Sequence, residues 1–148
     1  MKGRIILLLL VLFYWAHYLN SIDDHQNTIL AAPSIWINGK GSELIIDSFD
    51  AETNMIKGTY INTAEGFPCQ NIEYPLSGWL YNSIISFSVI WKSSEESCDA
   101  LTTWIGYIKD DTLITSWQLI NKDMKGLAEL LTGEDDFKLV EEERKNFK

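Results

Sequence analysis

The stretch TWIGYIKDDTLITSW, Thr103 to Trp117, decides the fold class of this chain. Two runs rich in Thr, Ile, Trp and Tyr flank a polar turn at Asp110-Asp111, which is the pattern of a β-hairpin. No window after Ser34 has a long helical period, and short alternating runs separated by Gly, Asn, Asp and Ser turns dominate instead. The sequence therefore predicts an all-β protein.

Eight such runs follow one another with short connections. We expect strands near residues 34–38, 42–48, 54–62, 74–81, 84–92, 99–109, 111–120 and 134–140. Residues 121–132 (NKDMKGLAELLT) could hold a short helical turn. Short antiparallel strands of this kind suit an up-and-down barrel or a sandwich, and a closed barrel of eight strands has room inside for one small ligand.

The N-terminus has the character of a targeting segment. Lys2 and Arg4 precede an unbroken apolar run, Ile5 to Ala16, which has signal-peptide length and is short for a bilayer span. An uncleaved anchor is the alternative. We expect a signal peptide at 1–21, with cleavage possible as late as 32, a linker at 22–33, one folded domain at 34–140 and a charged C-terminal tail at 141–148. The mature protein is then secreted or periplasmic, with no stable membrane association.

Charge and cysteine content narrow the function classes. The net charge of −9, from 12 basic and 21 acidic residues, argues against a nucleic-acid partner. Cys69 and Cys98 both lie in the exported part, where two cysteines are read first as one disulfide. Without histidine partners they make a poor metal site, so we expect no metal.

Histidine is absent from the folded part of the sequence. His17 lies in the signal region and His25 in the linker. A Ser-His-Asp or Cys-His nucleophile and a histidine metal cluster are therefore excluded within one domain. Carboxylate-pair catalysis stays formally open, but we expect no catalytic residue and no enzymatic activity.

Strand alternation gathers aromatic and polar side chains on shared faces. These are Gly58, Tyr60 and Asn62; Phe87, Val89 and Trp91; Ala100, Thr102, Trp104 and Gly106; and Thr115, Trp117 and Leu119. Polar groups among tryptophans inside a barrel are costly unless something satisfies them. This combination suits a pocket for a small, partly polar ligand, although an ordinary tryptophan-containing core is the alternative.

Seven motifs then occur in the order found in the avidin and streptavidin family, which the chain resembles from Ser34 to about Leu139. The motifs are IWINGKGSELII (35–46), GTYIN (58–62), PLSG (75–78), ISFSVIWK (85–92), TTWIGY (102–107), TSWQL (115–119) and GEDDF (133–137). The resemblance implies an eight-stranded antiparallel up-and-down β-barrel that holds biotin with high affinity. Biotin is then a ligand, and no cofactor is expected.

The resemblance also implies roles for individual polar residues. Asn38, Ser42 and Tyr60 match the donors around the ureido oxygen of biotin, and three converging donors would stabilise its polarised form. Asp135 matches the aspartate that accepts from one ureido N–H. Asn62 stands where many members have Ser or Thr, and its amide oxygen could take the other N–H.

The remaining implied contacts are aromatic and apolar. Trp91, Trp104 and Trp117 resemble the walls around the bicyclic ring and the valeryl chain. Thr102 matches the residue near the ring sulfur, and Leu119 adds apolar contact.

The sequence departs from the family pattern at three places. Ala100 stands where members often carry Ser near the valeryl end, so one polar contact is missing there. The segment 121–131 has no tryptophan to cap a neighbouring subunit's pocket, which argues against a tetramer built around that lid. Glu65 follows Asn62 in a loop that could bring a like charge near the biotin carboxylate.

Cys69 and Cys98 lie in two loops that close over the same mouth of such a barrel. Cysteines at both positions, with Asn62 and the missing lid tryptophan, resemble the dimeric, rhizavidin-like bacterial branch of the family. The resemblance implies a homodimer in which a disulfide pre-orders the lid within one subunit. The alternative is an avidin-like barrel with weakened biotin binding that takes another small ligand or a protein partner.

Overall fold

A computed structural model describes residue 30 and residues 32–93, 98–122 and 128–140. The chain separates into two compact units, residues 1–31 and residues 32–148, and every strand lies in the second. The signal peptide expected at 1–21 and the tail expected at 141–148 lie outside the described residues. Within the described part of the chain, no helix combines the length and apolar character that a membrane crossing requires.

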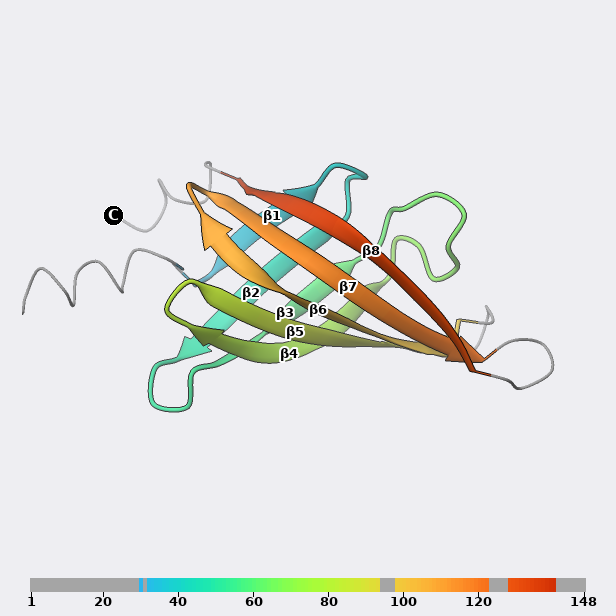
Figure 1. Ribbon diagram of the computed structural model, residues 1–148, viewed down its shortest axis with the longest axis horizontal. Helices are drawn as coiled ribbons and strands as arrows, with labels where there is room; N and C mark the ends of the chain where they lie inside the picture. Colours follow the sequence, from blue (N-terminus) through green and yellow to red (C-terminus); the bar gives the residue numbers. More distant parts are fainter. Residues whose placement is uncertain (1–29, 31, 94–97, 123–127, 141–148) are drawn as a thin grey trace, which may run out of the picture. The chain divides into compact units, whose positions relative to one another are not determined.

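Eight strands close into one antiparallel barrel, in which each strand pairs with the next and the last pairs with the first (Figure 1). The strands are β1 (Ser34–Asn38), β2 (Glu43–Asp50), β3 (Met55–Ile61), β4 (Glu73–Tyr81), β5 (Ile84–Trp91), β6 (Ala100–Lys109), β7 (Thr112–Lys122) and β8 (Ala128–Leu139). The expected up-and-down barrel is confirmed, and the sandwich alternative is wrong. Closure leaves no unpaired sheet edge.

The hairpin at Thr103–Trp117 forms as the polar turn and its two flanking runs predict. Asp110 and Asp111 both have positive φ, 49° and 57°, which is the geometry of a tight two-residue turn that matches the twist of the flanking strands. The resulting register places Trp104 directly opposite Trp117. Both indoles therefore lie on the inward face of neighbouring strands.

The helical turn considered for residues 121–132 is wrong wherever the structure describes that span. Asn121 and Lys122 end β7, and Ala128 begins β8, while residues 123–127 lie outside the described residues. Continuous pairing of β7 with β8 runs from Lys122↔Ala128 to Thr112↔Lys138. The ladder satisfies the backbone of Ala128–Thr132, so tertiary pairing overrides the helical propensity of this segment.

An apolar core fills part of the barrel interior. Its fully buried side chains include Trp36, Leu44, Ile46, Ile56, Ile85, Phe87, Leu113 and Phe137. Phe87 stacks on Trp104 with ring centroids 4.9 Å apart, and Phe137 meets the edge of Tyr60 at 6.3 Å. The core therefore supports two of the aromatic side chains expected at the ligand site.

Candidate functional site

The barrel encloses a cavity of about 440 Å³. Every residue expected to contact the ligand lines it: Asn38, Ser42, Tyr60, Asn62, Trp91, Thr102, Trp104, Trp117, Leu119 and Asp135. Such a volume suits a small organic ligand. The individual roles of these residues toward a ligand stay predictions.

Asn38 ends β1, and a turn fixes its orientation. Its Oδ1 accepts from the backbone N–H of Lys40 at 3.0 Å and of Ser42 at 2.9 Å. Gly41, with φ of 84°, allows the backbone reversal between them. Because Oδ1 is occupied by the turn, the Nδ2 group is the part of this buried side chain left to donate toward the cavity.

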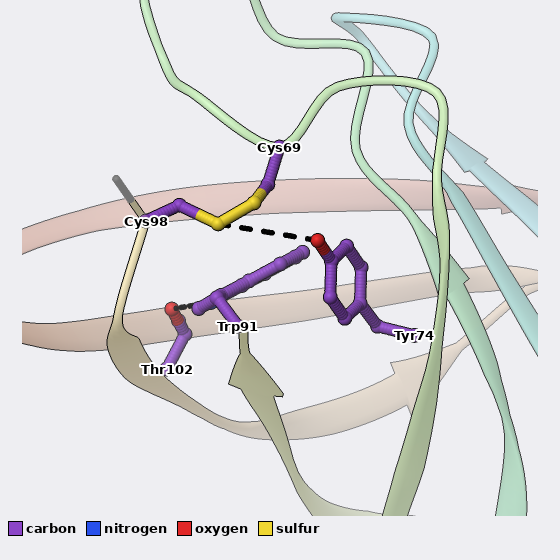
Figure 2. The surroundings of a disulfide bond; sticks show 5 residues. All are labelled: Cys69, Tyr74, Trp91, Cys98 and Thr102. Atoms are coloured by element: carbon purple, nitrogen blue, oxygen red, sulfur yellow. Dashed lines mark hydrogen bonds between the residues drawn. A yellow bond between two sulfur atoms is a disulfide. The ribbon is translucent and has the colours of Figure 1, made fainter. Parts of the chain in front are cut away.

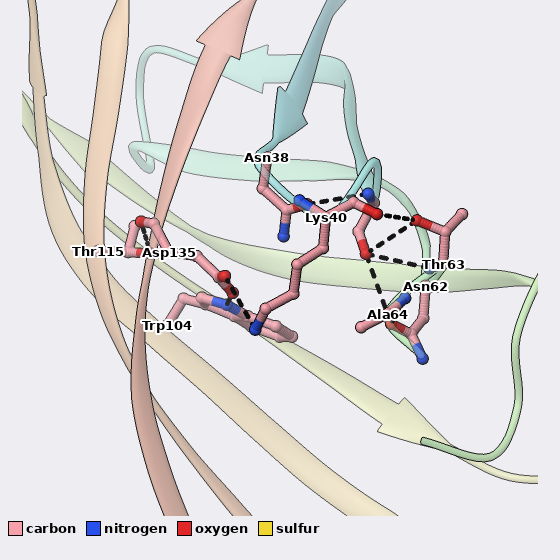
Figure 3. Close-up of polar contacts among 9 residues, drawn as sticks. Asn38, Lys40, Asn62, Thr63, Ala64, Trp104, Thr115 and Asp135 are labelled. Atoms are coloured by element: carbon pink, nitrogen blue, oxygen red, sulfur yellow. Dashed lines mark hydrogen bonds and ion pairs between the residues drawn. The ribbon is translucent and has the colours of Figure 1, made fainter. Parts of the chain in front are cut away.

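Ser42 and Asn62 are linked across the start of β2 and the end of β3. Ser42 Oγ accepts from the backbone N–H of Thr63 at 3.0 Å and donates to Asn62 Oδ1 at 3.4 Å. Asn62 Oδ1 also accepts from the Ala64 N–H at 3.1 Å (Figure 3). In this arrangement the Asn62 oxygen already has two donors, so a ligand N–H must replace the Ser42 contact to reach it.

Tyr60 is a buried phenol among aromatic rings. It stacks on Trp104 at 4.9 Å and meets Trp91 edge-on at 5.7 Å. Burial raises the Tyr60 pKa above its ordinary value, and the Asp135 charge raises it further, while a hydrogen bond with Ser42 acts in the opposite direction. The phenol therefore stays protonated and remains a hydrogen-bond donor at neutral pH.

Asp135 lines the cavity from β8, the strand that pairs with β1. Trp104 Nε1 donates to its Oδ2 at 3.4 Å, and Lys40 Nζ lies 3.8 Å from its Oδ1 (Figure 3). The Thr115 hydroxyl donates to the Asp135 backbone oxygen at 2.8 Å, which holds β8 against β7 at this point. Burial raises the pKa of the Asp135 carboxyl, whereas Trp104, Lys40 and Asn38 lower it.

The three cavity-lining tryptophans are held by specific neighbours. Trp91 Nε1 donates to Thr102 Oγ1 at 2.7 Å (Figure 2), and the Trp91 and Trp104 rings meet at 6.4 Å. Trp117 lies over Gly133 on β8, where an added Cβ would collide with the indole. The absent side chain at Gly133 therefore sets the position of this wall.

The cavity has lining residues that the sequence did not identify. These are Lys40, Ala64, Phe67, Pro68, Asp99, Asn121 and Leu131. Lys40 stands inside the motif NGKGS between two expected donors, which is a signal that could have found it. Asn121 could not be predicted as a cavity residue, because it falls in the segment where the sequence predicts a possible helical turn. Glu65 is exposed and is absent from the described cavity lining.

Two buried polar atoms at the cavity have no hydrogen-bond partner among the described residues. They are Trp117 Nε1 and Asn121 Oδ1. Asn121 lies directly opposite Ala100 in the β6–β7 ladder, and both line the cavity. The methyl group of Ala100 therefore faces an amide side chain across the strand pair.

Cys69 and Cys98 form a disulfide at the cavity rim, with Cα atoms 6.1 Å apart (Figure 2). Cys69 lies in the β3–β4 loop, and Cys98 precedes β6 and lines the cavity. The Tyr74 hydroxyl lies 3.9 Å from Cys98 Sγ, and Tyr74 packs edge-on against Trp91 at 5.0 Å. The predicted pairing is present, and it connects two loops beside a tryptophan wall.

Comparison with known proteins agrees with this geometry. The model of the avidin family matches residues 25–140. Afifavidin from Afifella pfennigii is 35% identical over 114 residues, covering 74% of this chain and 70% of that protein. The bradavidin2–biotin complex is 41% identical with a TM-score of 0.67, covering 75% of this chain and 99% of that one.

The rhizavidin–biotin complex is 37% identical with a TM-score of 0.68, covering 74% of this chain and 92% of that one. The resemblance noted from seven ordered motifs is therefore confirmed by the family model and by overall structure. This chain belongs to the avidin family.

Proposed function

We propose that this chain is an exported, high-affinity biotin-binding protein. The observation that carries the proposal is the convergence of donors and an acceptor across one cavity. Asn38, Ser42 and Tyr60 supply donors from β1–β3, and Asp135 supplies a carboxylate from β8. A ureido group presents one carbonyl oxygen and two N–H groups, which this arrangement complements.

Avidin-family proteins bind biotin as a ligand and are not enzymes. The expectations of no catalytic activity and no cofactor are therefore confirmed by family membership. Bradavidin2 and rhizavidin have both been solved as complexes with biotin. These complexes support biotin as the ligand of this chain.

The physical basis of tight binding lies in preorganisation. The Asn38 amide is fixed by its turn, and the Tyr60 phenol is fixed by aromatic packing, so neither loses much freedom when a ligand arrives. Hydrogen bonds to buried donors such as Asn38 and Tyr60 are stronger than the same bonds in water. Apolar contact with Trp91, Trp104 and Trp117 adds the hydrophobic contribution.

A homodimer forms the second part of the proposal. One apolar row crosses the outer barrel face: Ile90 (67% exposed), Leu101 (45%), Ile120 (51%) and Leu130 (57%) are register neighbours from β5 to β8. Contiguous exposed apolar surface commonly marks an interface. A second copy related by two-fold symmetry would cover this row with the same row.

The alternative function is an avidin-like barrel that binds another small ligand or a protein partner with weakened biotin binding. Ala100 favours it, because this cavity-lining side chain offers no hydroxyl to a ligand tail. A biotin complex of low affinity, together with a tighter non-biotin ligand, would support this alternative.

Titration with biotin tests the main proposal. We expect tryptophan emission to change on binding, since three indoles line the cavity. Asp135→Ala combined with Tyr60→Phe should abolish retention of biotin. Glu134→Ala, which removes a neighbouring exposed carboxylate on the same strand, is the matched control. Calorimetry that detects no binding at tens of micromolar would exclude the proposal.

A further inference from the structure

Lys40 is anchored at the cavity edge by its own backbone. Its N–H donates to Asn38 Oδ1 at 3.0 Å, and its carbonyl oxygen accepts from Thr63 Oγ1 at 2.9 Å. With the backbone held from both sides, the side chain extends from the β1–β2 turn toward Asp135 (Figure 3). Lys40 also lines the cavity, so it belongs to the walls of the candidate ligand site.

The ammonium and the carboxylate meet in unequal surroundings. Lys40 Nζ lies 3.8 Å from Asp135 Oδ1, while the side chain of Lys40 is 50% exposed and that of Asp135 is 11% exposed. The other groups acting on the carboxylate are the Trp104 N–H, the Asn38 amide and the Asp136 charge. Among these described groups, Lys40 is the cation.

We propose that Lys40 is a positioning residue of the ligand site. Through its ion pair it keeps Asp135 ionised and turned toward the cavity, so that this carboxylate accepts the ligand N–H in mild acid as well as at neutral pH. This inference rests on the proposed biotin site. It extends that proposal, since it assigns a role in recognition to a residue outside the expected contact set.

Lys40 and a ligand can share the same carboxylate. An ionised carboxylate has about four acceptor positions on two oxygens. The half-exposed ammonium keeps its contact with water, so a ligand N–H can bind without burying the lysine charge. Lys40 and the ligand N–H can therefore contact the Asp135 carboxylate at the same time, without competing for it.

The electrostatic consequence has a definite sign. Burial raises the pKa of Asp135, and the ammonium of Lys40 opposes that rise. Replacing Lys40 by Met removes the opposing charge, so the carboxyl takes up a proton at higher pH. A protonated Asp135 presents an O–H where the ligand requires an acceptor, so affinity falls earlier on acidification.

The test compares biotin affinity across pH in the full chain and in Lys40→Met. The matched control is Lys57→Met, which removes an exposed lysine of β3. We expect Lys40→Met to bind within a few-fold of the parent at neutral pH. As the pH is lowered, the biotin affinity of Lys40→Met should begin to fall at a higher pH than the affinity of the parent or of Lys57→Met. Superimposable profiles, or a uniform change at every pH, would overturn the proposal.

A second measurement separates this proposal from the biotin assignment. Carbon-13 NMR titration of the Asp135 carboxyl in the unliganded protein should show a higher midpoint in Lys40→Met than in Lys57→Met. If no variant binds biotin but the midpoint shift is present, biotin is rejected as the ligand. The electrostatic effect of Lys40 on Asp135 then still stands. Biotin binding with an unchanged midpoint would reject the role of Lys40.

Discussion

Single residues of this site owe their chemistry to local hydrogen bonds that the sequence only partly reveals. The position of Asn38 in a turn is readable from the motif NGKGS, and the structure adds that both turn amides occupy its oxygen. The expected contact residues all reach one cavity because the ordered motifs fix their strands and faces. The direction of the Lys40 side chain could not be predicted from the sequence, because a flexible side chain can point outward or inward from a turn.

Asp135 illustrates a conflict between function and stability. Its pKa is raised by burial above the ordinary value of 3.8. The contribution of Asp135 to the free energy of unfolding is therefore fully present below the pKa that this carboxyl has in the unfolded chain. It is lost as pH rises through the pKa that the carboxyl has in the folded protein. An ionised Asp135 at neutral pH destabilises the empty barrel relative to a neutral group.

Asp135→Asn is expected to raise the melting temperature of the unliganded protein at neutral pH. The difference should shrink below pH 3.8, where the parent carboxyl is protonated as well. Thermal unfolding at both pH values measures this, with Glu134→Gln at an exposed position as the control. A melting temperature at neutral pH equal to or below that of the parent would contradict the expectation.

Strands show how far alternation carries a prediction and where it stops. The β6–β7 hairpin was predictable because its turn and both flanking runs agree on one register. The beginning of β8 was not, because Ala128, Glu129 and Leu130 favour a helix in isolation and become a strand only by pairing with β7. Register also creates the outer apolar row, since one residue from each of four strands aligns there.

The outer row predicts an association that a single charge can disrupt. Leu101→Lys places an ammonium group in the middle of the row, on the outward face of β6. We expect the dimer to dissociate while the barrel stays folded, because this side chain contributes nothing to the cavity lining or to the buried core.

Sedimentation equilibrium of the parent and of Leu101→Lys measures the association directly. Thr103→Lys, an exposed position on the same face of β6, shows whether the effect depends on the apolar row. A monomeric parent at micromolar concentration would reject the homodimer, and so would an undiminished dimer in Leu101→Lys.

At the scale of the whole molecule, two features order the site: closure of the barrel holds the strands, and the disulfide holds two loops. The barrel fixes the side chains on β1–β8, whereas two loops contribute Ala64, Phe67, Pro68 and Cys98 to the cavity. Loops are held less firmly than a closed ladder. The Cys69–Cys98 bond connects these two loops within one chain.

Reduction of the disulfide is expected to raise the biotin off-rate and lower the melting temperature. The bond joins residues separated by 29 positions, and a crosslink of that span contributes about 3–4 kcal/mol to stability in the chain-entropy view. Off-rates measured with and without reductant test this. A Cys69→Ser/Cys98→Ser variant should release biotin fast under both conditions. An unchanged off-rate in the reduced parent would show that the loops are ordered without the bond.

The bare backbone of Gly133 under Trp117 makes the width of the cavity adjustable at one codon. A Cβ at position 133 would collide with the Trp117 indole, so this wall of the cavity would have to move to accommodate any larger residue. If the chain binds biotin as proposed, position 133 is therefore a place where a substitution is expected to change the rate of ligand release. A reagent built on this barrel could be graded in its release of biotin without altering any hydrogen-bonding residue of the site.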